Sequence, residues 1–235
     1  MDGLRRVGKG GGALSEVAHG WAPISEAPAP KQAAGGPGWR RYTQEMPRLF
    51  LVRHGEPETA WGGSDPDPGL SVLGRRQARR AAQDLAAFGA LTIVSSPMRR
   101  CRETALPTLE DNAGDLTIDP RVSEVACPPG VSDRRAWLAE NFPWSAPSIR
   151  RAWRSLAEPL HEWRAGVLAA VTAIEQDTVM FTHFIAINAV LGAALERQET
   201  IVARPDYASI TELVVRGDRL HLVRAGAQMI QGDVQ

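Results

Sequence analysis

The stretch that most constrains the fold is residues 48–58, "RLFLVRHGEPE", where a continuous apolar run ends abruptly in an arginine, a histidine and a glycine. An apolar run without alternation is typical of a strand that is buried on both faces of a parallel sheet. Two further runs of this kind, "LTIVSS" (91–96) and "TVMFTH" (178–183), also end in polar residues. We therefore expect three buried strands whose carboxyl ends carry the polar chemistry.

Helical patterns alternate with these strands. Residues 71–89 have small and apolar side chains at helical spacing, with Ser71 as the expected N-cap and Gly89 as the expected stop. Further helices are expected after the second and third strands, and the chain closes with two strands around the turn "RGD" (216–218). This alternation predicts an α/β fold, a three-layer sandwich with a mostly parallel central sheet, helices on both faces and a small helical lid insertion.

The chain divides into a tail and one domain. Residues 1–45 are rich in Gly, Ala and Pro without periodicity, and we expect a disordered tail there and a catalytic domain over 46–235. Because Met46 directly precedes the first strand, we expect it to be the native start. Residues of about 130–160 carry short helical patterns and several tryptophans, which predicts the helical lid insertion. Most of these tryptophans are expected to fill the insertion's own core, and the alternative is that one or two face the pocket.

Composition narrows the function classes. Lys+Arg and Asp+Glu both total 27, so no global field attracts nucleic acid or a membrane surface, and a small ligand is expected. Two cysteines and no secretory signal favour reduced thiols and a cytoplasmic location. The histidines and cysteines lack metal-ligand spacing, so we expect neither a metal nor another cofactor. The terminal hairpin offers an edge through which a homodimer could form.

The strand ends predict an anion site. In parallel sheets, ligands bind beyond the carboxyl ends of the strands. Arg53 and Arg100 can each offer forked donors to phosphate oxygens, and His54 and His183 add two imidazoles at the same edge. Phosphoryl transfer depends mainly on positioning and charge neutralisation, so these groups suit it.

Five motifs occur in order: "LVRHGE", "LSVLGRRQA", "SSPMRRCRETA", "RVSEV" and "FTH". Together they resemble the histidine phosphatase superfamily, which includes the cofactor-dependent phosphoglycerate mutases. The resemblance implies that His54 is the nucleophile that becomes phosphorylated and that Arg53 and Arg100 bind the phosphoryl group. It further implies that His183 stabilises that group and that Glu124 donates a proton to the leaving oxygen and then activates water.

Two of these assignments have competitors. Arg99 precedes Arg100 on the same helix, and one residue rotates a side chain by about 100°. The family pattern favours Arg100. Glu124 lacks the Gly-containing continuation found in many relatives, and the alternative is a surface acid in a loop.

The sequence also departs from the family pattern. Phe184 follows His183 where a glycine is usual, and we expect its ring to reshape the leaving-group side of the pocket. The family's Asn after the histidine motif falls at Ala60 or Trp61, and Ser64 or Ser95 could replace its contact. Glu56 and Glu58, which lie near the nucleophile in sequence, are expected to face solvent.

The predicted function follows from the size of the insertion. It is shorter than the lid of phosphoglycerate mutases, so water should reach the phosphohistidine and hydrolysis should exceed transfer. We therefore predict a phosphomonoester phosphatase that acts on a small phosphorylated substrate. The alternatives are a phosphoglycerate mutase-type phosphotransferase and a non-catalytic module that binds a phosphate ligand.

Overall fold

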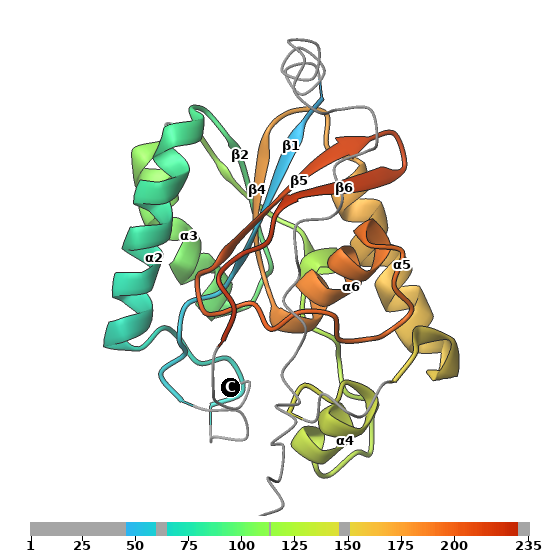
Figure 1. The fold of residues 1–235 in the computed structure, drawn as a ribbon. Coiled ribbons are helices and arrows are strands. Elements are labelled where there is room, and N and C mark those ends of the chain that lie inside the picture. The colour runs from blue at the N-terminus through green and yellow to red at the C-terminus, as the bar shows by residue number, and fades with distance from the viewer. Residues whose placement is uncertain (1–45, 60–64, 113, 146–150, 230–235) are drawn as a thin grey trace, which may run out of the picture.

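A six-stranded sheet with helices on both faces forms the centre of the molecule (Figure 1). The computed structural model describes residues 46–59, 65–112, 114–145 and 151–229, so the tail predicted over 1–45 lies outside the described residues. The strand order is β3-β2-β4-β1-β5-β6, and the strands are β1 (Arg48–Arg53), β2 (Thr92–Ser95), β3 (Leu116–Ile118), β4 (Thr178–Thr182), β5 (Ile210–Arg216) and β6 (Arg219–Arg224). The helices are α2 (Val72–Leu85), α3 (Arg99–Asp111), α4 (Arg134–Asn141), α5 (Glu158–Thr172) and α6 (Phe184–Ala194). Strands β1 to β4 run parallel to one another, β5 pairs antiparallel with β1, and β6 pairs antiparallel with β5. This mostly parallel sheet confirms the predicted α/β sandwich.

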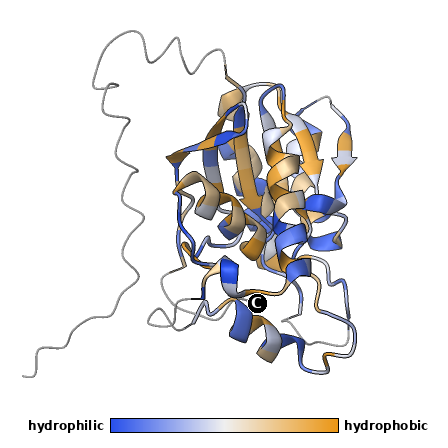
Figure 2. Cartoon of the chain, turned by 90° about the vertical axis from the view of Figure 1, so that its right-hand side faces the viewer, coloured by the Kyte–Doolittle hydropathy of each residue, from blue (hydrophilic) through white to orange (hydrophobic). Residues whose placement is uncertain are grey.

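The central strand β1 is buried on both sides. Leu49 and Leu51 lie in the core beneath α5 and α6, whereas Phe50 and Val52 lie in the core beneath α2 and α3. All four side chains are at most 1% exposed, and burial of each stabilises the fold by about 1.5–3 kcal/mol. Because neighbouring residues of a strand face opposite sides, a strand between two helical layers needs apolar residues at every position. Figure 2 shows hydrophobic segments in the central strands, next to helices that carry both hydrophobic and hydrophilic residues.

The order of the strands gathers the polar ends. Strand β4 lies between β1 and β2, so the residues that follow these three strands are neighbours. The backbone N–H of His54 donates to the carbonyl of Thr182 at 2.9 Å, and that of Ser96 donates to the carbonyl of Phe181 at 3.0 Å. The three predicted strands therefore end side by side, at the lower edge of the sheet in Figure 1, near α4.

Two glycines let α2 lie against the loop that follows β1. A Cβ on Gly55 would lie 2.7 Å from the carbonyl oxygen of Gly74, and a Cβ on Gly74 would overlap the carbonyl oxygen of Glu56. The side chain of Ser71 caps α2 as predicted and donates to the carboxylate of Glu56 at 2.8 Å. The prediction that Glu56 faces solvent is therefore wrong, since its carboxylate ties the loop to the helix, whereas Glu58 is exposed.

The region predicted as a helical insertion shares its core with α6. Trp144 and Trp153 are 3% and 1% exposed and pack in one cluster with Phe184 and Ile185 at the start of α6. The ring of Trp153 stacks on that of Trp163 in α5, with centroids 6.2 Å apart. These aromatic side chains anchor the segment that carries α4 next to the ends of the strands.

Within the described ranges, no helix has both the length and the apolar character needed to cross a bilayer. The long apolar stretch that begins at residue 178 divides into β4 and α6, as predicted.

Candidate active site

His54 follows β1 directly and is 3% exposed. Its Nδ1 lies 2.8 Å from the carbonyl oxygen of Gly55. Because a carbonyl only accepts hydrogen bonds, Nδ1 carries the proton and Nε2 keeps its lone pair. The backbone thus holds this imidazole in the tautomer that a nucleophile needs.

His183 lies beside it at the end of β4 and is fully buried. The two imidazole rings have centroids 5.3 Å apart and meet edge to face. Nδ1 of His183 lies 3.2 Å from Nη2 of Arg100. Because a guanidinium can only donate, Nδ1 of His183 accepts this hydrogen bond and its Nε2 carries the proton. Nε2 then donates to the hydroxyl of Ser96 at 2.8 Å. Both imidazoles therefore occupy defined orientations.

Arg100, rather than Arg99, points toward the histidines. Arg100 is 5% exposed, and its buried Nε has no hydrogen-bond partner within the described part of the chain. The side chain of Arg99 is 53% exposed and pairs with Glu103 at 2.7 Å. The rotation of one residue along α3 thus separates a site arginine from a surface arginine.

Arg53, the last residue of β1, is fully buried. Its Nη1 donates to the carbonyl of Pro205 at 3.0 Å and to the sulfur of Met229 at 3.2 Å. The guanidinium carbon lies 3.9 Å from the ring centroid of Tyr207 and 5.3 Å from that of Phe184. Phe184 is 1% exposed, so its ring packs against Arg53 and the core instead of forming the leaving-group wall that was expected.

Asn188 positions the chain that holds Arg53. Its buried side chain accepts hydrogen bonds from the backbone N–H groups of Val202 and Ala203, both at 2.8 Å. Its amide group donates to the carbonyl of Phe184 at 2.9 Å. The segment that leads to Pro205 is thereby fixed to α6.

Glu124 is half-buried and faces the start of α6. Its carboxylate accepts hydrogen bonds from the backbone N–H groups of Val125 and Ile185, both at 3.1 Å. Burial raises the pKa of this carboxyl, although those two N–H groups and the charge of Arg100 act in the opposite direction. These contacts differ from those of a surface acid in a loop, which was the alternative for this residue.

The site holds two buried arginines although the chain as a whole is neutral. Burial, together with the charges of Arg100 and Arg53, holds the pKa values of His54 and His183 well below the usual histidine value. Both imidazoles are therefore neutral at pH 7, and the cationic charge comes from the two arginines. A site of this kind can bind a dianion through its two guanidiniums and present a neutral imidazole nitrogen to it.

Other nucleophiles and metals fit the site less well. The sulfur of Cys101 lies 3.3 Å from Nε2 of His183, but burial raises the pKa of this thiol to about 12, so it stays protonated. Among the residues that the structure describes, no group of three or more His, Cys, Asp or Glu side chains is placed to hold a metal.

The sequence profile of the histidine phosphatase superfamily (branch 1) matches residues 49–228. The chain belongs to this superfamily. The match begins at β1 and ends beyond β6, so it includes all three strand ends that meet at the site.

The chain is similar to curated proteins over part of their length. A bifunctional protein of Mycobacterium tuberculosis is 29% identical over 197 residues, which are 74% of this chain and 52% of that protein. A glucosyl-3-phosphoglycerate phosphatase of Mycolicibacterium vanbaalenii is 36% identical over 110 residues, 46% of this chain and 47% of the relative. The chain thus spans about half the length of the curated relatives it matches.

Solved structures of the superfamily share the fold. A mycobacterial glucosyl-3-phosphoglycerate phosphatase in complex with VO3 has a TM-score of 0.59 and 25% identity over 77% of this chain and 100% of that chain. A phosphoserine phosphatase mutant from Entamoeba histolytica, in complex with phosphoserine, has a TM-score of 0.58 over 76% of this chain and 96% of that chain. At 19% identity the second similarity concerns the fold alone.

Three residues at the site were missed by the sequence reasoning. The hydroxyl of Ser96 accepts from His183, and that of Thr104 accepts from the N–H of Gly55 at 2.9 Å. The helical spacing of Thr104 from Arg100 was a usable signal, since residues four apart share a face. No sequence signal pointed to Tyr207, because it lies in the loop before the antiparallel strand β5 and not at the end of a parallel strand. Of the two residues expected to replace the contact of the missing Asn, Ser95 donates to a backbone carbonyl and Ser64 lies outside the described residues. Ala60 and Trp61, where that Asn would fall, also lie outside them.

Proposed function

We propose that this chain is a phosphomonoester phosphatase that works through a phosphohistidine on His54. The observation that carries the proposal is the orientation of the His54 imidazole, whose Nδ1 faces the carbonyl of Gly55 while the ring centroid lies 5.3 Å from that of His183. Arg53 and Arg100, both buried beside it, supply the charge that a phosphoryl dianion requires.

The reaction has two steps in this proposal. In the first, Nε2 of His54 attacks phosphorus, the bond from phosphorus to the ester oxygen breaks, and the carboxyl proton of Glu124 moves to that oxygen. In the second, the Glu124 carboxylate takes a proton from water while the water oxygen attacks phosphorus. The phosphorus–nitrogen bond then breaks, which releases inorganic phosphate and restores neutral His54.

His183 changes its protonation during this cycle in the proposal. Without a ligand, its Nδ1 accepts a hydrogen bond from Arg100. A phosphoryl dianion placed beside the ring raises the pKa of His183, because an opposite charge stabilises the imidazolium. The imidazolium then donates to the transferred group, and Arg100 turns its donors to the same oxygens.

Glu124→Gln provides a test of the proton donor. The amide can keep the contact with Ile185 but carries no proton for the leaving oxygen, so we expect about a 10²–10³-fold lower rate on an alkyl phosphate. The loss should be much smaller with p-nitrophenyl phosphate, whose leaving group departs without a proton.

The pH dependence gives a second test of Glu124. For the wild type, the rate should fall as pH rises through the pKa of Glu124, which burial raises above its ordinary value. The pH profile of kcat/KM checks this, and the same alkaline limb in both proteins would remove Glu124 from the acid role.

We further propose that the substrate carries a carboxylate near its phosphate. Arg53 and Arg100 together balance the phosphoryl dianion, and a third guanidinium, that of Arg134 at the start of α4, donates to the carbonyl of Val125 at 3.2 Å. This carbonyl belongs to the residue after Glu124. Because Glu124 donates its proton to the leaving oxygen in this proposal, the leaving group lies beside Glu124. A relative supports this class, since glucosyl-3-phosphoglycerate combines a carboxylate with a phosphate ester.

The test compares two substrates that differ mainly in this carboxylate. Phosphate release from 3-phosphoglycerate and from glycerol 3-phosphate would be measured for the wild type, Arg134→Ala and Arg135→Ala. We expect Arg134→Ala to lower kcat/KM about 10-fold for 3-phosphoglycerate and less than about 2-fold for glycerol 3-phosphate, because a charge-assisted contact is lost. Arg135, one residue along α4 and rotated by about 100°, is the matched control and should leave both values unchanged.

Each other outcome has a defined meaning. An equal loss on both substrates would contradict the carboxylate proposal while keeping the phosphatase. Formation of 2-phosphoglycerate without phosphate release would indicate the mutase alternative. No turnover of any phosphomonoester would overturn the enzymatic proposal and favour a binding module.

A further inference from the structure

Tyr207 lies in the loop that leads into β5 and packs on the face of a phosphate-site arginine. Its ring centroid is 3.9 Å from the guanidinium carbon of Arg53 and 5.8 Å from the ring centroid of His54. On another side of the same guanidinium lies the ring of Phe184, at 5.3 Å. Two aromatic rings thus limit the positions that the guanidinium plane can take.

The loop is attached to the end of β1. The N–H of Ala208 donates to the carbonyl of His54, and the N–H of Arg53 donates to the carbonyl of Ser209, both at 3.3 Å. Ala208 has a φ of 52°, a left-handed conformation that a residue with a Cβ keeps when its surroundings hold it there. The position of Tyr207 is therefore set relative to Arg53 at the end of β1 and to His54, which follows it.

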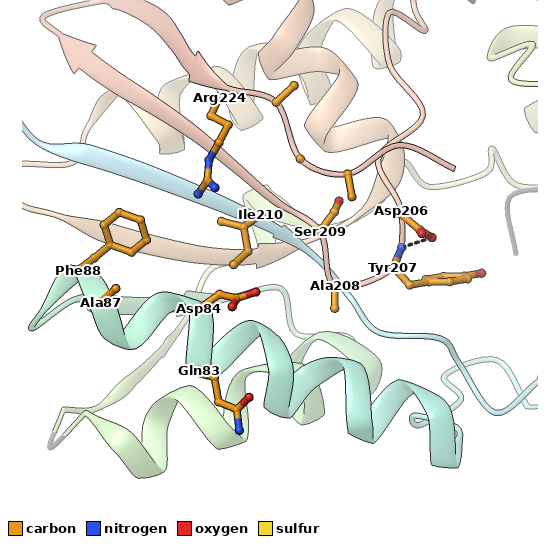
Figure 3. Close-up of a pocket in the computed structure, with 13 residues that line it drawn as sticks. Gln83, Asp84, Ala87, Phe88, Asp206, Tyr207, Ala208, Ser209, Ile210 and Arg224 are labelled. Carbon is orange, nitrogen blue, oxygen red and sulfur yellow. Dashed lines mark hydrogen bonds between the residues drawn. The ribbon is translucent and has the colours of Figure 1, made fainter. Parts of the chain in front are cut away.

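The other side of this loop borders a groove rather than the packed core. The groove has a volume of about 660 Å³ and lies between the end of α2 and the β5–β6 hairpin, with Phe88 and Arg224 on its walls (Figure 3). Figure 3 shows the ring of Tyr207 at one end of this groove, directed away from both of those residues. The Tyr207 ring does not pack against Phe88 or Arg224 on the groove walls, and the contact that accounts for its direction is the one with Arg53.

We infer that Tyr207 is a positioning residue, which holds the Arg53 guanidinium in the orientation that binds the phosphoryl group. A long flexible side chain loses conformational freedom when it binds an anion, and a guanidinium already held in place loses less. The ring face lies against the guanidinium, and the Tyr207 side chain also forms a hydrogen bond with Arg53. Phenylalanine should therefore replace tyrosine in large part, whereas an aliphatic side chain should not. The inference rests on the proposed function in taking phosphate as the ligand of Arg53.

The experiment measures phosphate binding separately from turnover. Isothermal titration of the full chain with inorganic phosphate would be compared for the wild type, Tyr207→Phe, Tyr207→Leu and Tyr207→Ala, together with KM and kcat for p-nitrophenyl phosphate. We expect Kd and KM to rise about 10-fold in the Leu and Ala variants and less than about 3-fold in the Phe variant. Gln83→Ala, on the exposed wall of the same groove, is the control and should match the wild type.

The Leu and Phe variants separate positioning from folding. Both fill most of the tyrosine's volume, so an equal rise in Kd for both, or no rise in any variant, would overturn the inference. A lower melting temperature with unchanged phosphate affinity would also overturn it, because it would indicate a purely structural role. Wild-type protein that binds phosphate but hydrolyses no ester would refute the proposed function alone, and wild-type protein that binds no phosphate would refute this inference as well.

Discussion

We expect His54→Ala to abolish the proposed phosphatase turnover, with a loss of at least about 10⁴-fold in kcat, because no other described group is placed to take over the nucleophilic step. Cys101, the nearest alternative, is a buried thiol whose pKa is raised to about 12. The measurement is phosphate release from p-nitrophenyl phosphate between about pH 5 and 7.5, a range set by imidazole titration. Rapid quench of the wild type during turnover should also trap a phosphoenzyme that the variant does not form.

The control for this variant is His221→Ala. His221 lies exposed on β6, far in the strand order from the end of β4, and its loss should leave turnover within about 2-fold of the wild type. The His54 imidazole bonds to the carbonyl of its own neighbour, so its removal should leave the fold intact, as a melting temperature would verify. Substantial turnover by His54→Ala would exclude a phosphohistidine at this position.

Arg100→Ala should lower kcat/KM by about 10²–10³-fold, because it removes preorganised donors from a buried site where charge develops in the transition state. Arg99→Ala is the matched control on the same helix. Its ion pair with Glu103 is exposed, and such pairs contribute about 0–1 kcal/mol to stability. We therefore expect activity within about 3-fold of the wild type for Arg99→Ala.

Arg100→Lys adds a finer comparison. Lysine keeps the charge but loses the planar fork of donors, so its activity should lie between that of Arg100→Ala and that of the wild type. Steady-state kinetics on one substrate checks all three variants. A larger loss in Arg99→Ala than in Arg100→Ala would reverse the assignment of the phosphate-binding arginine.

Local pattern was sufficient for much of the fold. The unbroken apolar runs at β1 and β4 predicted buried parallel strands, because a strand between two helical layers cannot tolerate alternation. Ser71 and Gly89 predicted the ends of the α2 region, because capping depends on one or two residues; Gly89 indeed has a φ of 80°. These features are local in sequence, so no knowledge of distant contacts was needed.

Contacts between distant segments could not be predicted in the same way. The carboxylate of Glu56 was expected in solvent, yet it bonds to Ser71 across a turn whose closeness depends on two facing glycines. Phe184 was expected beside the leaving group, yet its ring packs on Arg53. In each case the outcome depends on how two elements approach one another, which local propensity does not encode.

By itself, the sequence determined the class of fold and the chemical types at the strand ends, because strand burial and the motifs around His54 and His183 are local patterns. For the predicted phosphate-binding arginine on the helix after the second strand, it left Arg99 as a competitor of the favoured Arg100. Only the tertiary structure decided between Arg99 and Arg100 by burial, turned Glu124 toward the start of α6, and brought Tyr207 onto the guanidinium of Arg53. The physical reason is that these relations depend on the order of strands in the sheet and on helix rotation, which place residues far apart in the chain within a few ångströms of each other.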